Sequence, residues 1–199
     1  MEIVCLDLEV VLVPEIWISV AEKTGIYELN ATTRDIPDYD ELMRQRLKIL
    51  KEHNLGLPVI QQVISELKPL EGAKAFLEWL KTEFQVVILS DTFYEFAKPL
   101  MCQLDWPTLF CHRLNTDLRG QIVGYNLRMR DHKREAVKAF KFLQFRVCAV
   151  GDSFNDLSML FEADTGIFFR PPANISEKYS QLPVIKEYDE LKKQLIGIK

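Results

Sequence analysis

The sequence has no pair of cysteines at CxxC spacing, and it contains only four cysteines in 199 residues. Three of them, Cys5, Cys111 and Cys148, lie in apolar runs typical of strands, and no histidine stands at a ligand spacing from any cysteine. We therefore expect all four, Cys102 included, to be free buried thiols rather than ligands of zinc or halves of disulfides. Free thiols indicate a reducing compartment, and cytoplasm is the default expectation.

Long hydrophobic runs and clusters of basic residues are also missing. The apolar start of the chain is interrupted by Glu2, Asp7 and Glu9, so we predict neither a signal peptide nor a membrane span. The net charge is -4, and lysine and arginine are scattered along the chain. This distribution argues against a nucleic-acid partner, because no basic surface is available to follow a phosphate backbone. Nothing in the sequence indicates the oligomeric state.

What the chain does have is an alternation of strand and helix patterns. Short apolar runs that end at polar or small residues cover residues 2–7, 84–91, 146–152 and 165–170. Helical spacing of apolar residues appears between them, for example at 72–84 and 133–143. The alternation predicts an α/β fold with a doubly wound, Rossmann-like parallel sheet. Such sheets bind ligands beyond the carboxyl ends of their strands.

Two stretches depart from this alternation. Residues 14–68 have only helical periodicity and are bracketed by Pro14 and Pro69, which favour abrupt changes of chain direction. We predict that this helical segment is a small domain inserted after the first strand, with residues 1–13 and 69–199 forming the main domain. The runs 111–117 and 121–128 predict a β-hairpin with Gly120 in its turn.

Carboxylates follow two of the predicted strands. Asp7 and Glu9 come directly after the first apolar run, although a solvated strand end would look the same. Another strand runs into Gly151-Asp152, and Asn155 and Asp156 then open a helix. Mg²⁺ prefers hard oxygen ligands, usually one or two carboxylates together with waters and phosphate oxygens. Asp7 and Asp152 from neighbouring strand ends therefore predict a magnesium site.

Donors suited to phosphate stand between these acidic sites. The hydroxyl of Ser90 and the backbone amide of Asp91 follow a third strand and can donate to phosphoryl oxygens. Lys133 stands at the start of a helix and can supply positive charge, although a lysine at such a position is more often a surface residue.

Taken in order, the strings DLEVVLVPEIW and ILSDTFYEF, then Lys133, then GDSFNDLSML resemble the four motifs of the haloacid dehalogenase (HAD) superfamily. The resemblance spans essentially the whole chain and is greatest to the bifunctional phosphoserine phosphatase/homoserine phosphotransferase family within the phosphoserine phosphatase branch. Members of that family have Glu two residues after the nucleophile, where most relatives have Asp, and the residue at this position here is Glu9. The helical segment resembles the small helical cap of the superfamily, and the main domain resembles its HAD-like core.

The resemblance implies that Asp7 attacks phosphorus and becomes an aspartyl phosphate. Glu9 is implied as the general acid and base, while its backbone carbonyl helps Asp7 and Asp152 to hold Mg²⁺. Asp156 is implied to orient the waters of the metal. The groups implied to hold the phosphoryl oxygens are Ser90, the Asp91 amide, Lys133 and Asn155.

Substrate selection is implied to lie in the helical segment. Glu15 and Arg46 match positions that grip the amino and carboxylate groups of phosphoserine, and the charges suit those groups. Both also lie in helical environments where solvated surface side chains are common. We expect Trp17 and Tyr39 to pack within the segment rather than to contact substrate. The acceptor of the phosphoryl group is implied to be water or homoserine.

Val10 departs from the resembled family, in which this position is usually small. A β-branched residue resists positive φ and adds bulk near the expected pocket. Two alternatives therefore stay open besides a phosphoserine phosphatase with homoserine phosphotransferase activity. One is a HAD phosphatase for another small phosphomonoester. The other is a catalytically impaired protein that binds a phosphorylated amino acid, and only Val10 favours it.

Overall fold

The computed structural model describes residues 1–32, 35–36 and 38–198, and these form a seven-stranded sheet in the order β4-β3-β2-β1-β5-β6-β7. The strands are β1 (Glu2–Leu6), β2 (Gln85–Phe93), β3 (Leu109–Thr116), β4 (Ile122–Asn126), β5 (Arg146–Gly151), β6 (Thr165–Phe169) and β7 (Val184–Ile185). All neighbours are parallel except β3 and β4, which form the predicted hairpin with Gly120 at φ 76°. The predicted α/β doubly wound sheet is confirmed, and β7 is an addition too short to leave a periodic pattern.

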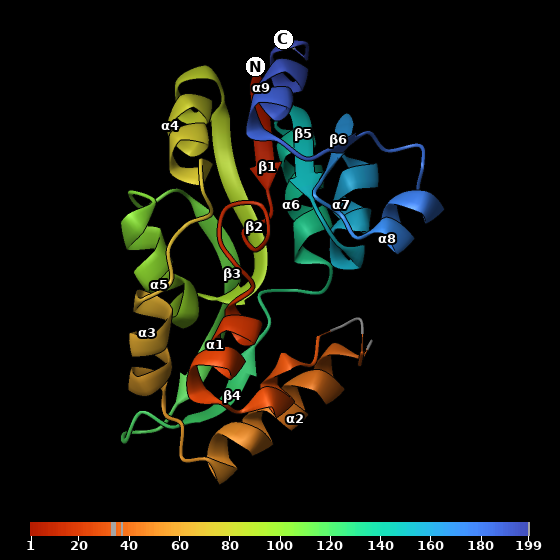
Figure 1. Cartoon of the computed structure of the whole chain (residues 1–199). Helices are drawn as coiled ribbons and strands as arrows, with labels where there is room; N and C mark the ends of the chain where they lie inside the picture. The colour runs from red at the N-terminus through yellow and green to blue at the C-terminus, as the bar shows by residue number, and fades with distance from the viewer. Residues whose placement is uncertain (33–34, 37, 199) are drawn as a thin grey trace.

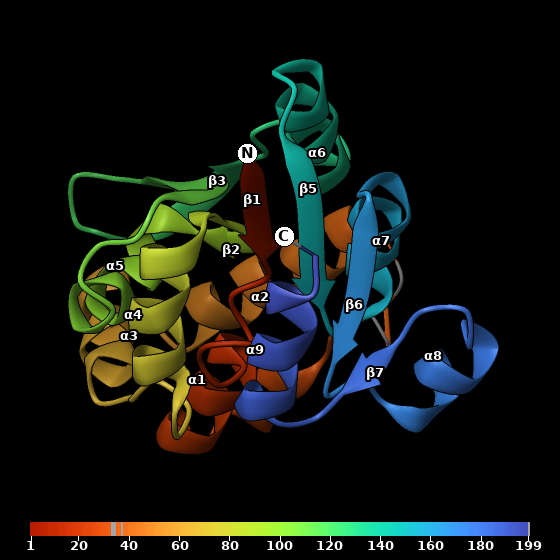
Figure 2. The ribbon, with the colours of Figure 1, turned by 90° about the horizontal axis from the view of Figure 1, so that it is seen from above.

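Helices cover both faces of this sheet (Figure 2). They are α4 (Ala73–Glu83), α5 (Tyr94–Gln103), α6 (His132–Phe142), η2 (Phe154–Asp156), α7 (Leu157–Glu162), α8 (Ala173–Lys178) and α9 (Tyr188–Ile196). Buried residues of α4, α5 and α9 form one apolar core with one face of the sheet, and those of α6, α7 and α8 form a second core with the other. None of the helices in the described residues has the length and apolarity that a membrane crossing requires.

The helical segment lies between β1 and α4, at the carboxyl edge of the central strands (Figure 1). It contains α1 (Ile16–Thr24), η1 (Tyr27–Asn30), α2 (Tyr39–Glu52) and α3 (Leu57–Ser65). Its entry and exit are joined, because the Leu70 amide donates to the Leu12 carbonyl at 2.9 Å. The segment shares the core of α4 and α5, where the rings of Trp17 and Phe96 lie 5.2 Å apart. This shared core fixes α1 and α3 against the body of the protein.

The cysteines of this fold are all free thiols. Cys5, Cys111 and Cys148 are buried in strands, as predicted from the apolar runs around them. The prediction is wrong for Cys102, which is exposed near the end of α5. Its neighbour Met101 faces the core, and adjacent positions on a helix point about 100° apart.

Candidate active site

The carboxyl ends of β1, β2 and β5 meet at a pocket of about 110 Å³ beneath the helical segment. Of the predicted site residues, those that line the pocket are Asp7, Glu9, Glu15, Arg46, Ser90, Asp91, Asp152 and Asn155. The remaining two, Lys133 and Asp156, are buried outside the lining, and Lys133 contacts both Asp7 and Asp156. The strand ends account for the convergence, because parallel strands deliver their final residues to one edge of the sheet.

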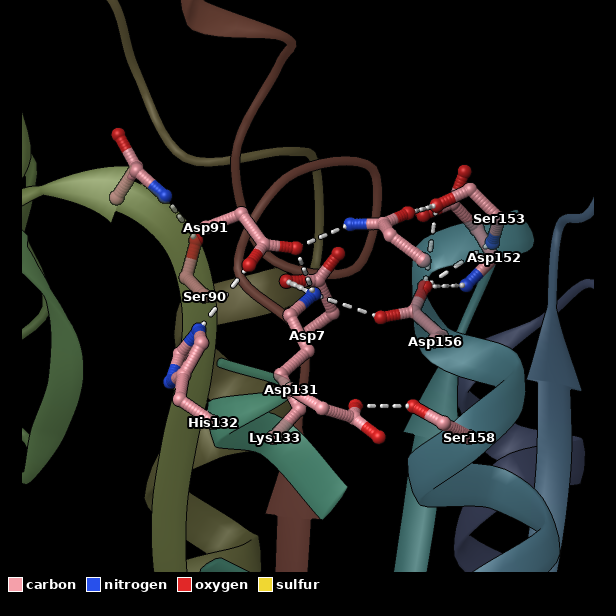
Figure 3. Close-up of polar contacts among 12 residues, drawn as sticks. Asp7, Ser90, Asp91, Asp131, His132, Lys133, Asp152, Ser153, Asp156 and Ser158 are labelled. Atoms are coloured by element: carbon pink, nitrogen blue, oxygen red, sulfur yellow. Dashed lines mark hydrogen bonds and ion pairs between the residues drawn. The ribbon is translucent and has the colours of Figure 1, made fainter. Parts of the chain in front are cut away.

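Asp7, which lines the pocket, belongs to a buried ion cluster around Lys133 (Figure 3). The Lys133 ammonium lies 3.0 Å from Asp7 Oδ1 and 2.7 Å from Asp156 Oδ1. Its exposure is only 2%, so the interpretation of this lysine as a surface residue is excluded. Burial raises the pKa of Asp7 well above its ordinary value, and the charge of Asp156 adds to the effect, while Lys133 opposes it. The ionised form of Asp7 thus depends on nearby positive charge.

Asp156 also fixes the loop that follows β5. Its carboxylate accepts hydrogen bonds from the backbone amides of Asp152 and Ser153, both at 3.0 Å. This arrangement requires a glycine at 151, because a Cβ there would lie 2.4 Å from the Asp156 Cγ atom. The GDxxND string is therefore a folded unit that presents the Asp152 side chain beside Asp7.

The same region fits a divalent cation. Carboxylate oxygens of Asp7, Asp152 and Asp156 lie within 4.8 Å of one another, and all three residues are buried. The Lys133 ammonium contacts two of these carboxylates, those of Asp7 and Asp156. Clustered carboxylate oxygens are the hard donors that a divalent metal ion requires.

Glu9 stands at the junction between the strand end and the helical segment. Burial and the charge of Glu15 raise the pKa of Glu9 to about 7, while Arg46 and a hydrogen bond from the Ile16 backbone lower it. A carboxyl group with a pKa near 7 can both give and accept a proton at neutral pH. Its place in the pocket therefore suits a general acid and base.

Val10 has a positive φ, the backbone conformation that a β-branched residue resists. Its φ is 63°, in the left-handed region, and its amide donates to the Val13 carbonyl at 2.7 Å. The side chain lines the pocket. A left-handed conformation costs a β-branched residue about 1–2 kcal/mol, so backbone strain is stored beside Glu9.

Val10→Gly is expected to leave the protein within about 1 kcal/mol of wild-type stability, and at least as stable as Val10→Ala. Relief of the positive φ offsets the greater flexibility of unfolded glycine, which costs roughly 0.5–1 kcal/mol. Alanine keeps a Cβ at the strained position and loses the methyl groups. Denaturant unfolding of the three proteins measures the difference. A glycine variant less stable than the alanine variant by about 1 kcal/mol would show that Val10 is not strained.

Arg46 is a pocket residue rather than a surface one. It is 7% exposed, its guanidinium lies 4.4 Å from the centre of the Trp17 ring, and its Nη2 donates to the Ala31 carbonyl at 2.9 Å. Its Nε is buried and has no hydrogen-bond partner among the described residues. Burial lowers the pKa of Arg46 to about 10, which leaves the group charged at neutral pH. A buried cation with an unused donor is suited to an anionic ligand.

Trp17 and Tyr39, which were expected to pack within the helical segment, both line the pocket. The Tyr39 hydroxyl of α2 donates to the Asp91 carbonyl at 3.2 Å, so Tyr39 also joins the helical segment to β2. Two further residues at the site, both histidines, were not predicted from the sequence. His112 and His132 approach the Asp91 carboxylate. These two histidines are 20 positions apart, on β3 and α6, and no local spacing connects them.

Comparisons with known proteins agree with this geometry. A family model described as a haloacid dehalogenase-like hydrolase matches residues 15–164. A phosphoserine phosphatase of Pseudomonas syringae pv. tomato is 63% identical over 195 residues, which cover 98% of this chain and 82% of that protein. Phosphoserine phosphatase ThrH of Pseudomonas aeruginosa is 60% identical over 196 residues, covering 98% and 96%. A solved substrate-bound phosphoserine phosphatase has the same fold, with a TM-score of 0.80 at 22% identity over 100% of this chain and 98% of that chain.

The chain belongs to the haloacid dehalogenase-like hydrolase family and is an enzyme of that family. Within the family it is homologous over nearly its whole length to the two Pseudomonas proteins. The resemblance inferred from the four motifs is thus confirmed.

Proposed function

We propose that the protein is a magnesium-dependent phosphoserine phosphatase that forms an aspartyl phosphate at Asp7 and can also transfer the phosphoryl group to homoserine. The observation that carries the proposal is a single pocket with two chemical ends. Asp7 lines one end and contacts the buried Lys133 ammonium, and Arg46 and Glu15 line the end on the side of the helical segment. The names of the two Pseudomonas relatives support phosphoserine as the donor.

In this proposal residues 14–68 act as a cap over a core of residues 1–13 and 69–199. Two contacts across the boundary support this division. The Tyr39 hydroxyl bonds to the Asp91 carbonyl, and the Tyr125 hydroxyl of β4 bonds to the Asp40 carboxylate of α2. Both hydrogen bonds involve residues at the start of α2. Closure of this helix over the pocket would exclude water during phosphoryl transfer.

The first half-reaction transfers the phosphoryl group to the enzyme. A carboxylate oxygen of Asp7 forms a bond to phosphorus as the bond to the serine oxygen breaks, and Glu9 gives a proton to that oxygen. Serine leaves, and Asp7 carries the phosphoryl group. The groups proposed to hold the phosphoryl oxygens are Ser90, the Asp91 amide, Lys133 and Asn155.

Mg²⁺ would be held by the carboxylates of Asp7 and Asp152 and by the backbone carbonyl of Glu9. When bound, the ion supplies positive charge that offsets repulsion between the Asp7 nucleophile and the phosphoryl oxygens. Asp156 contributes by fixing the Asp152 loop and the Lys133 ammonium, and it would orient water molecules beside the metal site.

The second half-reaction releases the phosphoryl group from Asp7. Glu9, now ionised, takes a proton from water or from the hydroxyl of homoserine, and that oxygen forms a bond to phosphorus as the bond to Asp7 breaks. The products are inorganic phosphate or phosphohomoserine. Homoserine is serine lengthened by one methylene, so Arg46 and Glu15 can hold its carboxylate and amino groups in the same way.

Replacing Arg46 with Ala is expected to lower kcat/KM for phosphoserine by roughly 10² or more, or about 3 kcal/mol, because a charge-assisted contact to the carboxylate is lost. An aryl phosphate lacks that carboxylate and should be hydrolysed almost as before. Arg44, an exposed arginine of the same helix, provides the matched control, and Arg44→Ala should change neither rate. Equal losses on both substrates would assign Arg46 to folding or cap closure and would favour a phosphatase for another phosphomonoester.

Saturating homoserine is expected to divert a substantial share of the phosphoryl groups from phosphoserine into phosphohomoserine. A bound hydroxyl gains effective concentration over water, and a closed cap removes competing solvent. Arg46→Ala should reduce the share that reaches homoserine. The test follows serine, free phosphate and phosphohomoserine separately. If free phosphate equals the serine released at every homoserine concentration, the transferase activity is absent and a simple phosphatase remains.

A further inference from the structure

The Asp91 carboxylate at the end of β2 is surrounded by hydrogen-bond donors from three other elements. On Oδ1, His132 Nε2 lies at 3.1 Å and His112 Nε2 at 3.5 Å. On Oδ2, Asn155 Nδ2 lies at 2.6 Å and the Lys133 ammonium at 3.4 Å. A carboxylate has about four lone-pair sites, and four donors face this one. Both oxygens of the Asp91 carboxylate are therefore in contact with donor groups.

This arrangement keeps Asp91 ionised. Burial alone would raise the pKa of the carboxyl group, but the charge of Lys133 and the hydrogen bonds from His112, His132 and Asn155 hold that pKa well below its ordinary value. The negative charge is thus a permanent part of the site, close to where a phosphoryl group would bind.

The His112 tautomer is fixed by its other nitrogen. His112 Nδ1 accepts a hydrogen bond from the Arg128 backbone amide at 3.1 Å, so in the neutral ring the proton lies on Nε2, which faces Asp91. A protonated nitrogen cannot bind a metal ion. Although ligand atoms of Asp91, His112 and His132 lie within 4.8 Å of one another, this tautomer makes His112 a donor to the Asp91 carboxylate.

Asp91 contacts Lys133 and Asn155, two side chains that must be oriented to bind a phosphoryl group. Lys133 has a flexible stem, and two further carboxylates, those of Asp7 and Asp156, attract its ammonium group. Asn155 comes from η2 and is exposed, so packing alone does not fix its amide. Asp91 Oδ2 contacts both groups. The Lys133 ammonium thus has Asp91 as a third fixed neighbour beside Asp7 and Asp156 (Figure 3).

We propose that the Asp91 carboxylate is a positioning residue that aims the Lys133 ammonium and the Asn155 amide at the transferring phosphoryl group, and that His112 and His132 hold the carboxylate for this task. The proposal rests on phosphoryl transfer at Asp7 but not on the identity of the donor. The Asp91 backbone and its side chain then have separate roles, since the amide is the group proposed to bind phosphate.

Asp91→Asn tests this role because the tautomer of His112 dictates how the new amide must lie. Its oxygen has to face the histidine donors, so its NH₂ group faces Lys133 and Asn155, which are donors too. We expect kcat/KM to fall by roughly 10- to 100-fold on both phosphoserine and 4-nitrophenyl phosphate, mainly in kcat, with the unfolding midpoint little changed. If Asp91→Asn keeps the wild-type kcat/KM on every substrate that the wild-type enzyme hydrolyses, the proposal is wrong.

A double-mutant cycle separates positioning from a general structural effect. If Asp91 acts through Asn155, combining Asp91→Asn with Asn155→Ala should cost clearly less than the product of the two single losses. Losses that multiply would overturn the role through Asn155. His112→Phe removes a donor but keeps a ring, and it should lower kcat severalfold, whereas the exposed control His53→Phe should not. A full rate in His112→Phe would contradict the part assigned to His112.

The two substrates distinguish this proposal from the proposed function. If 4-nitrophenyl phosphate is hydrolysed and phosphoserine is not, phosphoserine as the donor is wrong, while the cycle on the aryl substrate still decides the role of Asp91. If neither is hydrolysed, both proposals fail together.

Discussion

Asp7→Asn is expected to reduce the turnover of phosphoserine below about 1% of wild type while the protein stays folded. An amide oxygen is a poor nucleophile and a weaker metal ligand than a carboxylate, so the enzyme cannot form a stable covalent intermediate. The loss should be the same on an aryl phosphate, since the nucleophile serves every donor.

The folded state should tolerate this change for an electrostatic reason. The raised pKa of Asp7 means that its ionised form is disfavoured by burial and by Asp156, so a neutral amide removes an unfavourable charge. Lys133 keeps its contacts with Asp156 and Asp91. Denaturant unfolding is the control. The free energy of unfolding of Asp7→Asn should be lower than that of wild type by at most about 1 kcal/mol. Activity well above 1% in a folded variant would remove Asp7 from the mechanism.

Glu9→Gln is expected to lose on the order of 10² to 10⁴ in kcat on phosphoserine, as for a missing general acid and base. Glutamine keeps the length of the side chain and the backbone carbonyl, so metal binding should persist. Since the pKa of Glu9 is raised to about 7, the wild-type group supplies both protonation states near neutral pH, and the amide supplies neither.

Two comparisons make the Glu9 result specific. With an aryl phosphate, whose leaving group needs no proton, phosphorylation of Asp7 should remain fast in Glu9→Gln while release of phosphate becomes slow. The first turnover should then appear as a burst. Glu9→Asp keeps a carboxylate on a shorter stem and should retain more activity than Glu9→Gln. An unchanged kcat in Glu9→Gln would mean that another group exchanges the proton.

The parts of the fold that the sequence predicts are those determined by local patterns. The apolar runs before Asp7, Asp91 and Asp152 are strands, and each was predicted within two residues of its observed end. Because parallel strands bring such ends to one edge, the meeting of Asp7, Asp91 and Asp152 followed from the alternating strand and helix pattern. The hairpin followed from two short runs separated by Gly120.

The parts of the site that the sequence does not predict depend on long-range packing. His112 and His132 meet at Asp91 only because β3 pairs with β2 and α6 packs beneath the sheet. The burial of Arg46 likewise depends on the Trp17 ring, which α1 delivers from another helix. A helical pattern predicts which face of α2 is apolar but not which ring covers a charged side chain. The positive φ at Val10 was anticipated as a conflict, and the fold keeps the strained conformation.

Chemical trapping can show whether phosphoserine phosphorylates Asp7. The enzyme would be mixed with Mg²⁺ and phosphoserine, quenched in acid within one turnover, and treated with borohydride, which reduces an acyl phosphate to an alcohol. Peptide mapping should then locate the reduced residue at position 7, in an amount that falls as turnover is completed and that is absent without phosphoserine. Rapid release of serine and phosphate with no reduced residue at position 7 would show that Asp7 is not the nucleophile.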